Sequence, residues 1–322
     1  MTLIAVLLVV VVSLLGCIAF RLQTPKTQAL RKPINSLKMA VYSSADGVPA
    51  ALVEERDACG VGFIASLNNR PSHSVVKQSL DALNCMEHRG ASSADNISGD
   101  GAGVLTSIPW GLLKSFVDPS SALNGDGTTA CAVAMIFLPK DMALYDKSVT
   151  LIKDISLKRG FEILGIRDVP TDRSVLGELS KDFVPQIRQL FFRAKPGAAS
   201  TQRDLEQKLY ELRREIQGGF RQLGSQEAYV CSLSSKTIVY KGMLRSCDLA
   251  QFYTDLRNPS YESAFSIYHR RFSTNTVPKW FLAQPMRLLA HNGEINTLLG
   301  NINWVKSRAL ANKQGMYLYF LW

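Results

Sequence analysis

The sequence predicts an α+β domain in which sheets are covered by helices. Many segments have the short apolar runs of strands, whereas few have the periodicity of helices. Strands and helices do not alternate regularly, which argues against a parallel βαβ arrangement. The chain has 322 residues, of which 46% are hydrophobic and 20% charged, so it can bury the core of one large domain or two small ones.

The folded part is expected to open with a strand at 59–67, where small and apolar residues mix, and then a helix at 74–87. Further helices are predicted at 141–158, 201–217 and 294–310, with Thr201 as the N-cap of the second of these. Segment 118–128, rich in Ser, Asn, Gly and Asp, is expected to be an exposed connection. Further strands are predicted at 103–107, 130–138, 161–169, 184–193, 227–232, 237–240, 263–270 and 286–291.

Charge, cysteine and histidine patterns exclude several classes of function. The net charge is +10, but it includes no basic block interleaved with aromatic residues, so we expect no nucleic-acid partner. The six cysteines are widely spaced, which favours free thiols in a reducing compartment over a disulfide framework. The four histidines lack metal-ligand spacing, so no metal site is expected in this chain.

Residues 1–45 are predicted to be a bipartite targeting leader. The apolar run at 3–20 suits a signal-peptide core, and 21–44 is rich in Lys, Arg, Ser and Thr without acidic residues, as in a transit peptide. A signal peptide followed by a transit peptide resembles the leaders of algae with complex plastids. This predicts plastid localisation, in the chloroplast stroma, and only transient membrane contact through the leader. The alternative is a membrane anchor with a basic flank. Residues 46–58 are interpreted as a propeptide.

Cys59 stands at the start of the first predicted strand and is followed by Gly60 and Gly62. This pattern suits a hydrolase whose nucleophile is its own N-terminal residue. There the chain is cut before the nucleophile, and the freed α-amine, with a reference pKa of about 7.7–8.0, acts as general base. The two glycines would let other backbone approach. The alternative is a buried structural cysteine in a glycine-rich strand.

Several motifs begin at Cys59 or follow it along the chain. They are C-G-V-G-F at 59–63, M-E-H-R-G at 86–90, A-D-N at 94–96, S-G-D-G-A-G at 98–103, T-S-I-P-W at 106–110, R-F-S-T-N-T at 271–276 and H-N-G-E-I-N-T at 291–297. The glycine cluster at 99–103 lacks the G-x-G-x-x-G spacing of a dinucleotide loop. In order and spacing, the motifs resemble the N-terminal class II glutamine amidotransferase domain of glutamate synthases, in particular the ferredoxin-dependent type.

The resemblance implies an N-terminal-nucleophile (Ntn) hydrolase fold, an αββα sandwich, over an incomplete domain at 59–308, with an off-family tail at 309–322. It implies Cys59 as the catalytic nucleophile, and Asn292 and Gly293 as the donors that stabilise the oxyanion. Arg271 is expected to hold the glutamine carboxylate, with Thr274 nearby. Arg89 is either part of the glutamine pocket or a structural cation that pairs with Asp95 or Asp100.

The resemblance also implies partners and cofactors. L-glutamine is the expected substrate, and in the full-length enzyme ferredoxin supplies electrons while ammonia passes to 2-oxoglutarate. The resemblance implies no cofactor in this chain, and FMN and a 3Fe–4S cluster in the synthase part beyond it. The family's acidic residue for the glutamine α-amine has no match here. Two alternatives stay open: an inactive truncated fragment, and another cysteine-dependent amidase of the same class.

Overall fold

The computed structural model describes residues 60–92, 95, 97–117, 130–270, 279–287, 303 and 307. The chain divides into the units 1–56 and 57–322, and every described residue lies in the second. The predicted leader and propeptide, the connection at 118–128 and the tail therefore lie outside the described residues. Within the described residues, no helix is both long and apolar enough to span a membrane.

Two four-stranded antiparallel sheets form the centre of the domain. The first sheet has the order β1-β8-β2-β7 and the second the order β4-β5-β3-β6. The first is built from β1 (Val61–Ala65), β8 (Phe265–Arg270), β2 (Ala102–Ser107) and β7 (Thr237–Gly242). The second is built from β4 (Phe161–Asp168), β5 (Gln186–Ala194), β3 (Cys131–Leu138) and β6 (Tyr229–Ser234).

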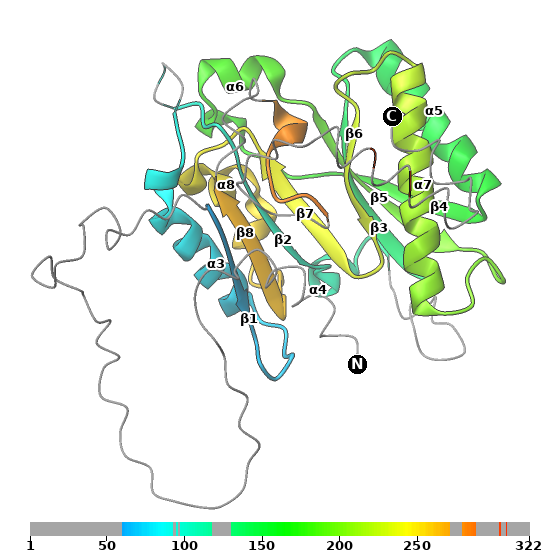
Figure 1. Ribbon diagram of the computed structural model, residues 1–322, viewed down its shortest axis with the longest axis horizontal. Helices are drawn as coiled ribbons and strands as arrows, with labels where there is room; N and C mark the ends of the chain where they lie inside the picture. The colour runs from blue at the N-terminus through cyan, green and yellow to red at the C-terminus, as the bar shows by residue number, and fades with distance from the viewer. Residues whose placement is uncertain are drawn as a thin grey trace, which may run out of the picture. The chain divides into compact units, whose positions relative to one another are not determined.

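Helices cover the outer face of each sheet (Figure 1). Helices α3 (His73–Cys85) and α8 (Ser246–Phe252) contact the first sheet, whereas α5 (Met142–Lys158) and α7 (Gln202–Gln222) contact the second. Strands β6 and β7 contact each other across the two sheets. The layers therefore run αββα, which confirms the predicted fold class.

Hydrophobic patterning explains the middle layers. Every residue of β3 is buried, as expected of a strand with a sheet partner on each side and a covered face above and below. In α7, Leu205, Leu209, Leu212 and Ile216 are fully buried and lie on one face, as their spacing predicts. The side chain of Thr201 accepts a hydrogen bond from the Asp204 N–H, which confirms the predicted N-cap.

The chain crosses from one sheet to the other between β6 and β7, since β6 ends at Ser234 and β7 begins at Thr237. Glu206 of α7 stabilises this crossing, because its carboxylate accepts hydrogen bonds from the Ser234 hydroxyl at 2.9 Å and the Ser235 N–H at 2.6 Å. A buried network also joins the sheets, in which Gln189 of β5 donates to the Tyr240 hydroxyl of β7 at 2.7 Å.

The predicted strands and helices before residue 271 are confirmed, with ends shifted by a few residues. At the predicted strand 286–291, Met286 and Arg287 are not in a strand, and the rest lies outside the described residues. Of the predicted helix at 294–310, only Asn303 and Ser307 are described, and both are helical. Short elements that the sequence did not predict are α4 (Trp110–Leu113), α6 (Glu178–Phe183), α8, η2 (Glu87–Arg89), η4 (Arg173–Val175), η5 (Thr254–Arg257) and η6 (Trp280–Leu282).

Candidate active site

Most of the predicted site residues lie outside the described residues. These are Cys59, Arg271, Thr274, Asn292 and Gly293. Arg89 is described, and so are Gly60 and Arg270, each of which is joined by one peptide bond to a predicted site residue. The structure therefore describes the residues next to most of the predicted site residues. We call these neighbouring residues the frame of the site.

The first part of this frame is the junction between β1 and β8. The Arg270 N–H donates a hydrogen bond to the Gly60 carbonyl at 2.6 Å, next to the antiparallel pair Val61 and His269. A Cβ atom on Gly60 would lie 2.0 Å from the Arg270 carbonyl oxygen, so a side chain there would collide with β8. This confirms that Gly60 allows a close approach of backbone. At Gly62 the neighbour is instead the ring of Tyr268, 2.5 Å from the position of a Cβ atom.

The second part of the frame is the side chain of Arg270, which is fully buried. Its guanidinium pairs with Asp100, donates to the Gly101 carbonyl at 3.1 Å and pairs with Glu87 at 3.0 Å. A Cβ atom on Gly90 would lie 1.9 Å from the Arg270 Cζ, so only glycine leaves room for the guanidinium there. The motifs M-E-H-R-G and S-G-D-G-A-G, which are separate in sequence, thus meet at one cation.

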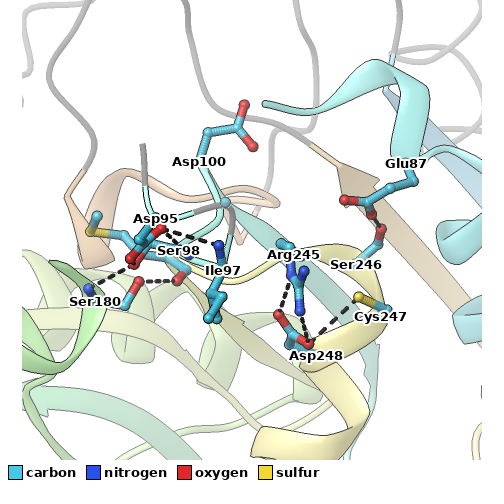
Figure 2. A network of polar contacts seen from close by, with 12 residues as sticks. Glu87, Asp95, Ile97, Ser98, Asp100, Ser180, Arg245, Ser246, Cys247 and Asp248 are labelled. Atoms are coloured by element: carbon cyan, nitrogen blue, oxygen red, sulfur yellow. Dashed lines mark hydrogen bonds and ion pairs between the residues drawn. The ribbon is translucent and has the colours of Figure 1, made fainter. Parts of the chain in front are cut away.

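The carboxylate of Glu87 has two polar partners. It pairs with Arg270 and also accepts a hydrogen bond from the hydroxyl of Ser246, at the start of α8 (Figure 2). Partial burial by itself raises the pKa of Glu87, but the Ser246 hydrogen bond and the charge of Arg270 outweigh it, so the net shift lowers the pKa. Glu87 is therefore an ionised counter-charge at neutral pH.

The loop that precedes Asp100 is fixed by Asp95 (Figure 2). Its carboxylate accepts hydrogen bonds from the Ser98 hydroxyl at 2.6 Å, the Ser98 N–H at 2.8 Å and the Ile97 N–H at 3.1 Å. These bonds, above all that of the Ser98 hydroxyl, lower the pKa of Asp95 to about 2. The Ser98 hydroxyl in turn accepts from the Ser180 N–H of α6 at 3.1 Å. Gly101 has a φ of +142°, which favours glycine at this position of the motif.

Arg89 lies in η2 and is half-buried. Within the described residues no ion pair of Arg89 is observed, and the two carboxylates have other partners: Asp95 binds Ser98, and Asp100 pairs with Arg270. Pairing of Arg89 with either carboxylate, the structural alternative for this residue, is therefore not observed. Its place in the glutamine pocket stays a prediction.

The start of α8 carries a further ion pair beside Ser246. Arg245 pairs with Asp248 at 2.7 Å and 3.1 Å through two guanidinium nitrogens. Partial burial and the nearby Asp248 raise the pKa of the Cys247 thiol, which makes it a poor nucleophile at neutral pH. In the described parts of the chain, no group of three His, Cys, Asp or Glu side chains is placed to hold a metal ion.

Sequence reasoning missed the role of Arg270. The signal was the pair of adjacent arginines before Phe272, of which only Arg271 carried a prediction. Arg270 could not be separated from an ordinary cation, because its carboxylate partners are 170 and 183 residues away in sequence.

Comparison with known proteins identifies the family of this chain. The model of the class II glutamine amidotransferases matches residues 59–318, so the match begins at Cys59 itself. The chain belongs to the class II glutamine amidotransferases, a family of enzymes.

Within this family, the chain is similar to ferredoxin-dependent glutamate synthases. It is 51% identical over 257 residues to ferredoxin-dependent glutamate synthase 2 of Synechocystis sp., and 49% identical over 259 residues to the chloroplastic ferredoxin-dependent glutamate synthase of Oryza sativa subsp. japonica. It is 48% identical over 267 residues to ferredoxin-dependent glutamate synthase 1, chloroplastic/mitochondrial, of Arabidopsis thaliana. The alignments cover 80%, 80% and 83% of this chain, but 16% of each relative.

Proposed function

We propose that this chain is the glutaminase part of a glutamate synthase, which hydrolyses L-glutamine to glutamate and ammonia with Cys59 as nucleophile. The observation that carries the proposal is that the family match starts at Cys59, directly before a glycine that is hydrogen-bonded to the end of β8. A cut after Ala58 would place the nucleophile and its base, the new α-amine, on the same residue.

The chemistry needs no histidine partner. The α-amine takes the proton of the Cys59 thiol, and the thiolate attacks the side-chain amide carbon of glutamine. Asn292 and Gly293 would donate hydrogen bonds to the oxyanion of the tetrahedral intermediate. The C–N bond breaks, and the amine's proton leaves with ammonia, so a γ-glutamyl thioester remains. Water, deprotonated by the same amine, then attacks the thioester, which releases glutamate and restores the thiol.

The two adjacent arginines would have different tasks. Arg270 is fully buried and already pairs with Glu87 and Asp100. We therefore assign the α-carboxylate of glutamine to Arg271, with Thr274 beside it, because a guanidinium fork matches a carboxylate with two charge-assisted hydrogen bonds. Arg89, which has no described ion-pair partner, is assigned to the same pocket.

In the full-length protein, the ammonia would pass to 2-oxoglutarate, with electrons supplied by ferredoxin. The names of the relatives support this ferredoxin dependence, and those of several support a plastid location. FMN and the 3Fe–4S cluster would then be held by regions that this chain does not cover. The leader at 1–45 and the propeptide at 46–58 remain part of the proposal.

A glutamine-analogue electrophile tests the nucleophile directly. We expect it to modify Cys59, glutamine to protect against it, and mass spectrometry to find a mature N-terminus at Cys59. Cys59→Ala should abolish labelling and ammonia release, whereas Cys85→Ala, which removes an exposed thiol, should leave both unchanged. Unmodified Cys59 would favour the inactive fragment, and modification without glutamine protection would favour a different amidase.

A further inference from the structure

We propose that Arg270 is a positioning residue for glutamine hydrolysis, which holds the attachment point of the nucleophile through its backbone and is itself held by Glu87 and Asp100. The inference rests on the proposed function. It assigns a function to Glu87 and Asp100, which lie in the family motifs, and to Arg270, which directly precedes one, although none of the three takes part in the chemical steps above.

The backbone contact is the first step. Gly60 and Arg270 are joined by a hydrogen bond of 2.6 Å, and no side chain separates their main chains. Cys59 is the next residue before Gly60, and consecutive Cα atoms are about 3.8 Å apart. A displacement of Arg270 therefore reaches the nucleophile through one hydrogen bond and one peptide unit.

The side chain is the second step. A fully buried guanidinium that loses one of its carboxylate partners keeps N–H donors that no solvent water can satisfy, which costs free energy. Arg270 can avoid this only in the position where Asp100 and Glu87 both reach it. Gly90 and Gly101 complete that position, the first by leaving room and the second by offering its carbonyl. The two motif carboxylates therefore determine where the end of β8 lies.

A purely stabilising role is the competing explanation, and the chain offers a matched pair to test it. Arg167 and Asp255 form a similarly buried ion pair, with contacts of 2.7 Å and 2.8 Å. Neither is bonded to a predicted site residue. Loss of this pair should weaken the fold without affecting the position of Cys59.

The experiment compares Asp100→Asn with Asp255→Asn in the mature protein that carries this domain. For Asp100→Asn we expect kcat for glutamine hydrolysis to fall about 10–100-fold, because small misplacements of reacting groups have effects of this size. KM should stay within about threefold, since the lost interaction acts in the transition state. Labelling of Cys59 by the glutamine analogue should slow in parallel, while labelling by iodoacetamide, which needs no bound geometry, should not. Asp255→Asn should keep kcat at temperatures where it is folded.

The inference is overturned if folded Asp100→Asn keeps kcat within about twofold of the wild type, or if Asp255→Asn lowers kcat equally. Should Asp100→Asn fail to fold, Glu87→Gln decides by the same measurements, because Glu87 is 44% exposed and its loss is better tolerated. A wild-type Cys59 that neither reacts with the analogue nor turns over glutamine overturns the proposed function, and this inference with it. A reactive wild type with an equally reactive Asp100→Asn overturns the inference alone.

Discussion

Arg270 and Lys241 are both fully buried cations, but their charges are stabilised in different ways. Arg270 is compensated by two carboxylates, whereas Lys241 forms no ion pair with any described residue. The Lys241 ammonium instead donates to the Phe281 carbonyl at 2.8 Å and lies 4.9 Å from the centre of the Tyr229 ring. Burial, in spite of the nearby Cys231, lowers the pKa of Lys241 to about 8.

This shift predicts a rise of stability with pH. Between about pH 8 and the ordinary lysine value of 10.5, the unfolded chain binds a proton that native Lys241 has lost, so the free energy of unfolding increases. Burial raises the pKa of Cys231 from 9.0 to about 12, which has the opposite and smaller effect as this thiol begins to ionise in the unfolded chain near pH 9. The groups that face Lys241 are Cys231, Tyr229 and Arg213. In the folded protein neither the thiol nor the phenol titrates between pH 8 and 9, because burial raises the pKa of both. A variant at position 241 keeps these groups, so their contribution to the pH dependence cancels in a comparison with the wild type.

Urea unfolding between pH 8 and 9 should therefore separate the wild type from Lys241→Met. The wild type should gain stability over this interval, by at most about 1.4 kcal/mol per pH unit for one proton. Lys241→Met should lose this gain because it lacks the titrating group. Equal pH slopes for the two proteins would contradict the assignment.

At the scale of elements, α7 shows a limit of prediction from sequence. The sequence predicts that the helix ends at Gln217, before Gly218 and Gly219, but it continues to Gln222. Gly219 is buried against Leu151 of α5, where a Cβ atom would lie 2.7 Å from a Leu151 methyl group. The glycine therefore serves helix packing, and the sequence carries no sign of that contact.

The two glycines provide a matched test. A Cβ atom on Gly218 would meet nothing within 4 Å, so Gly218→Ala should stabilise the domain by roughly 0.5–1 kcal/mol through helix propensity. Gly219→Ala should gain less or lose stability, because Leu151 must move. Thermal unfolding of both variants measures the difference, and equal gains would show that the α5–α7 contact does not constrain position 219.

Other elements were predictable where one kind of interaction dominates. Strand β3 is buried along its whole length and reads as an apolar run, and α5 and α7 show their periodicity. Helices α4, α6 and α8 are too short for a clear period, and tertiary contacts decide them. At the candidate site, motifs indicated the chemistry, but the meeting of Glu87, Asp100 and Arg270 depends on β1 and β2 lying on either side of β8.

At the scale of the whole molecule, a buried polar network holds the two sheets together. Asp255 accepts two hydrogen bonds from Arg167 of β4 and one from the Tyr240 hydroxyl of β7 at 2.9 Å. Gln189 of β5 bonds both Arg167 and Tyr240, at 2.7 Å each. Strands of both sheets thus share one set of partners, so we expect the sheets to unfold together.

A double-mutant cycle of Arg167 and Asp255 tests how strongly these two residues of the network are coupled. Asp255→Ala leaves the buried charge of Arg167 without its carboxylate and should cost about 3–5 kcal/mol of unfolding free energy. The double variant Arg167→Met with Asp255→Ala removes both charges and should recover part of that loss, since an apolar replacement of a buried ion pair is often tolerated. Circular dichroism and tryptophan fluorescence should give coincident urea transitions in each protein, as expected of a single cooperative unit. If the double variant loses as much free energy as Asp255→Ala and Arg167→Met lose separately in sum, the pair is uncoupled. Separate transitions for the two probes would mean that the sheets unfold independently.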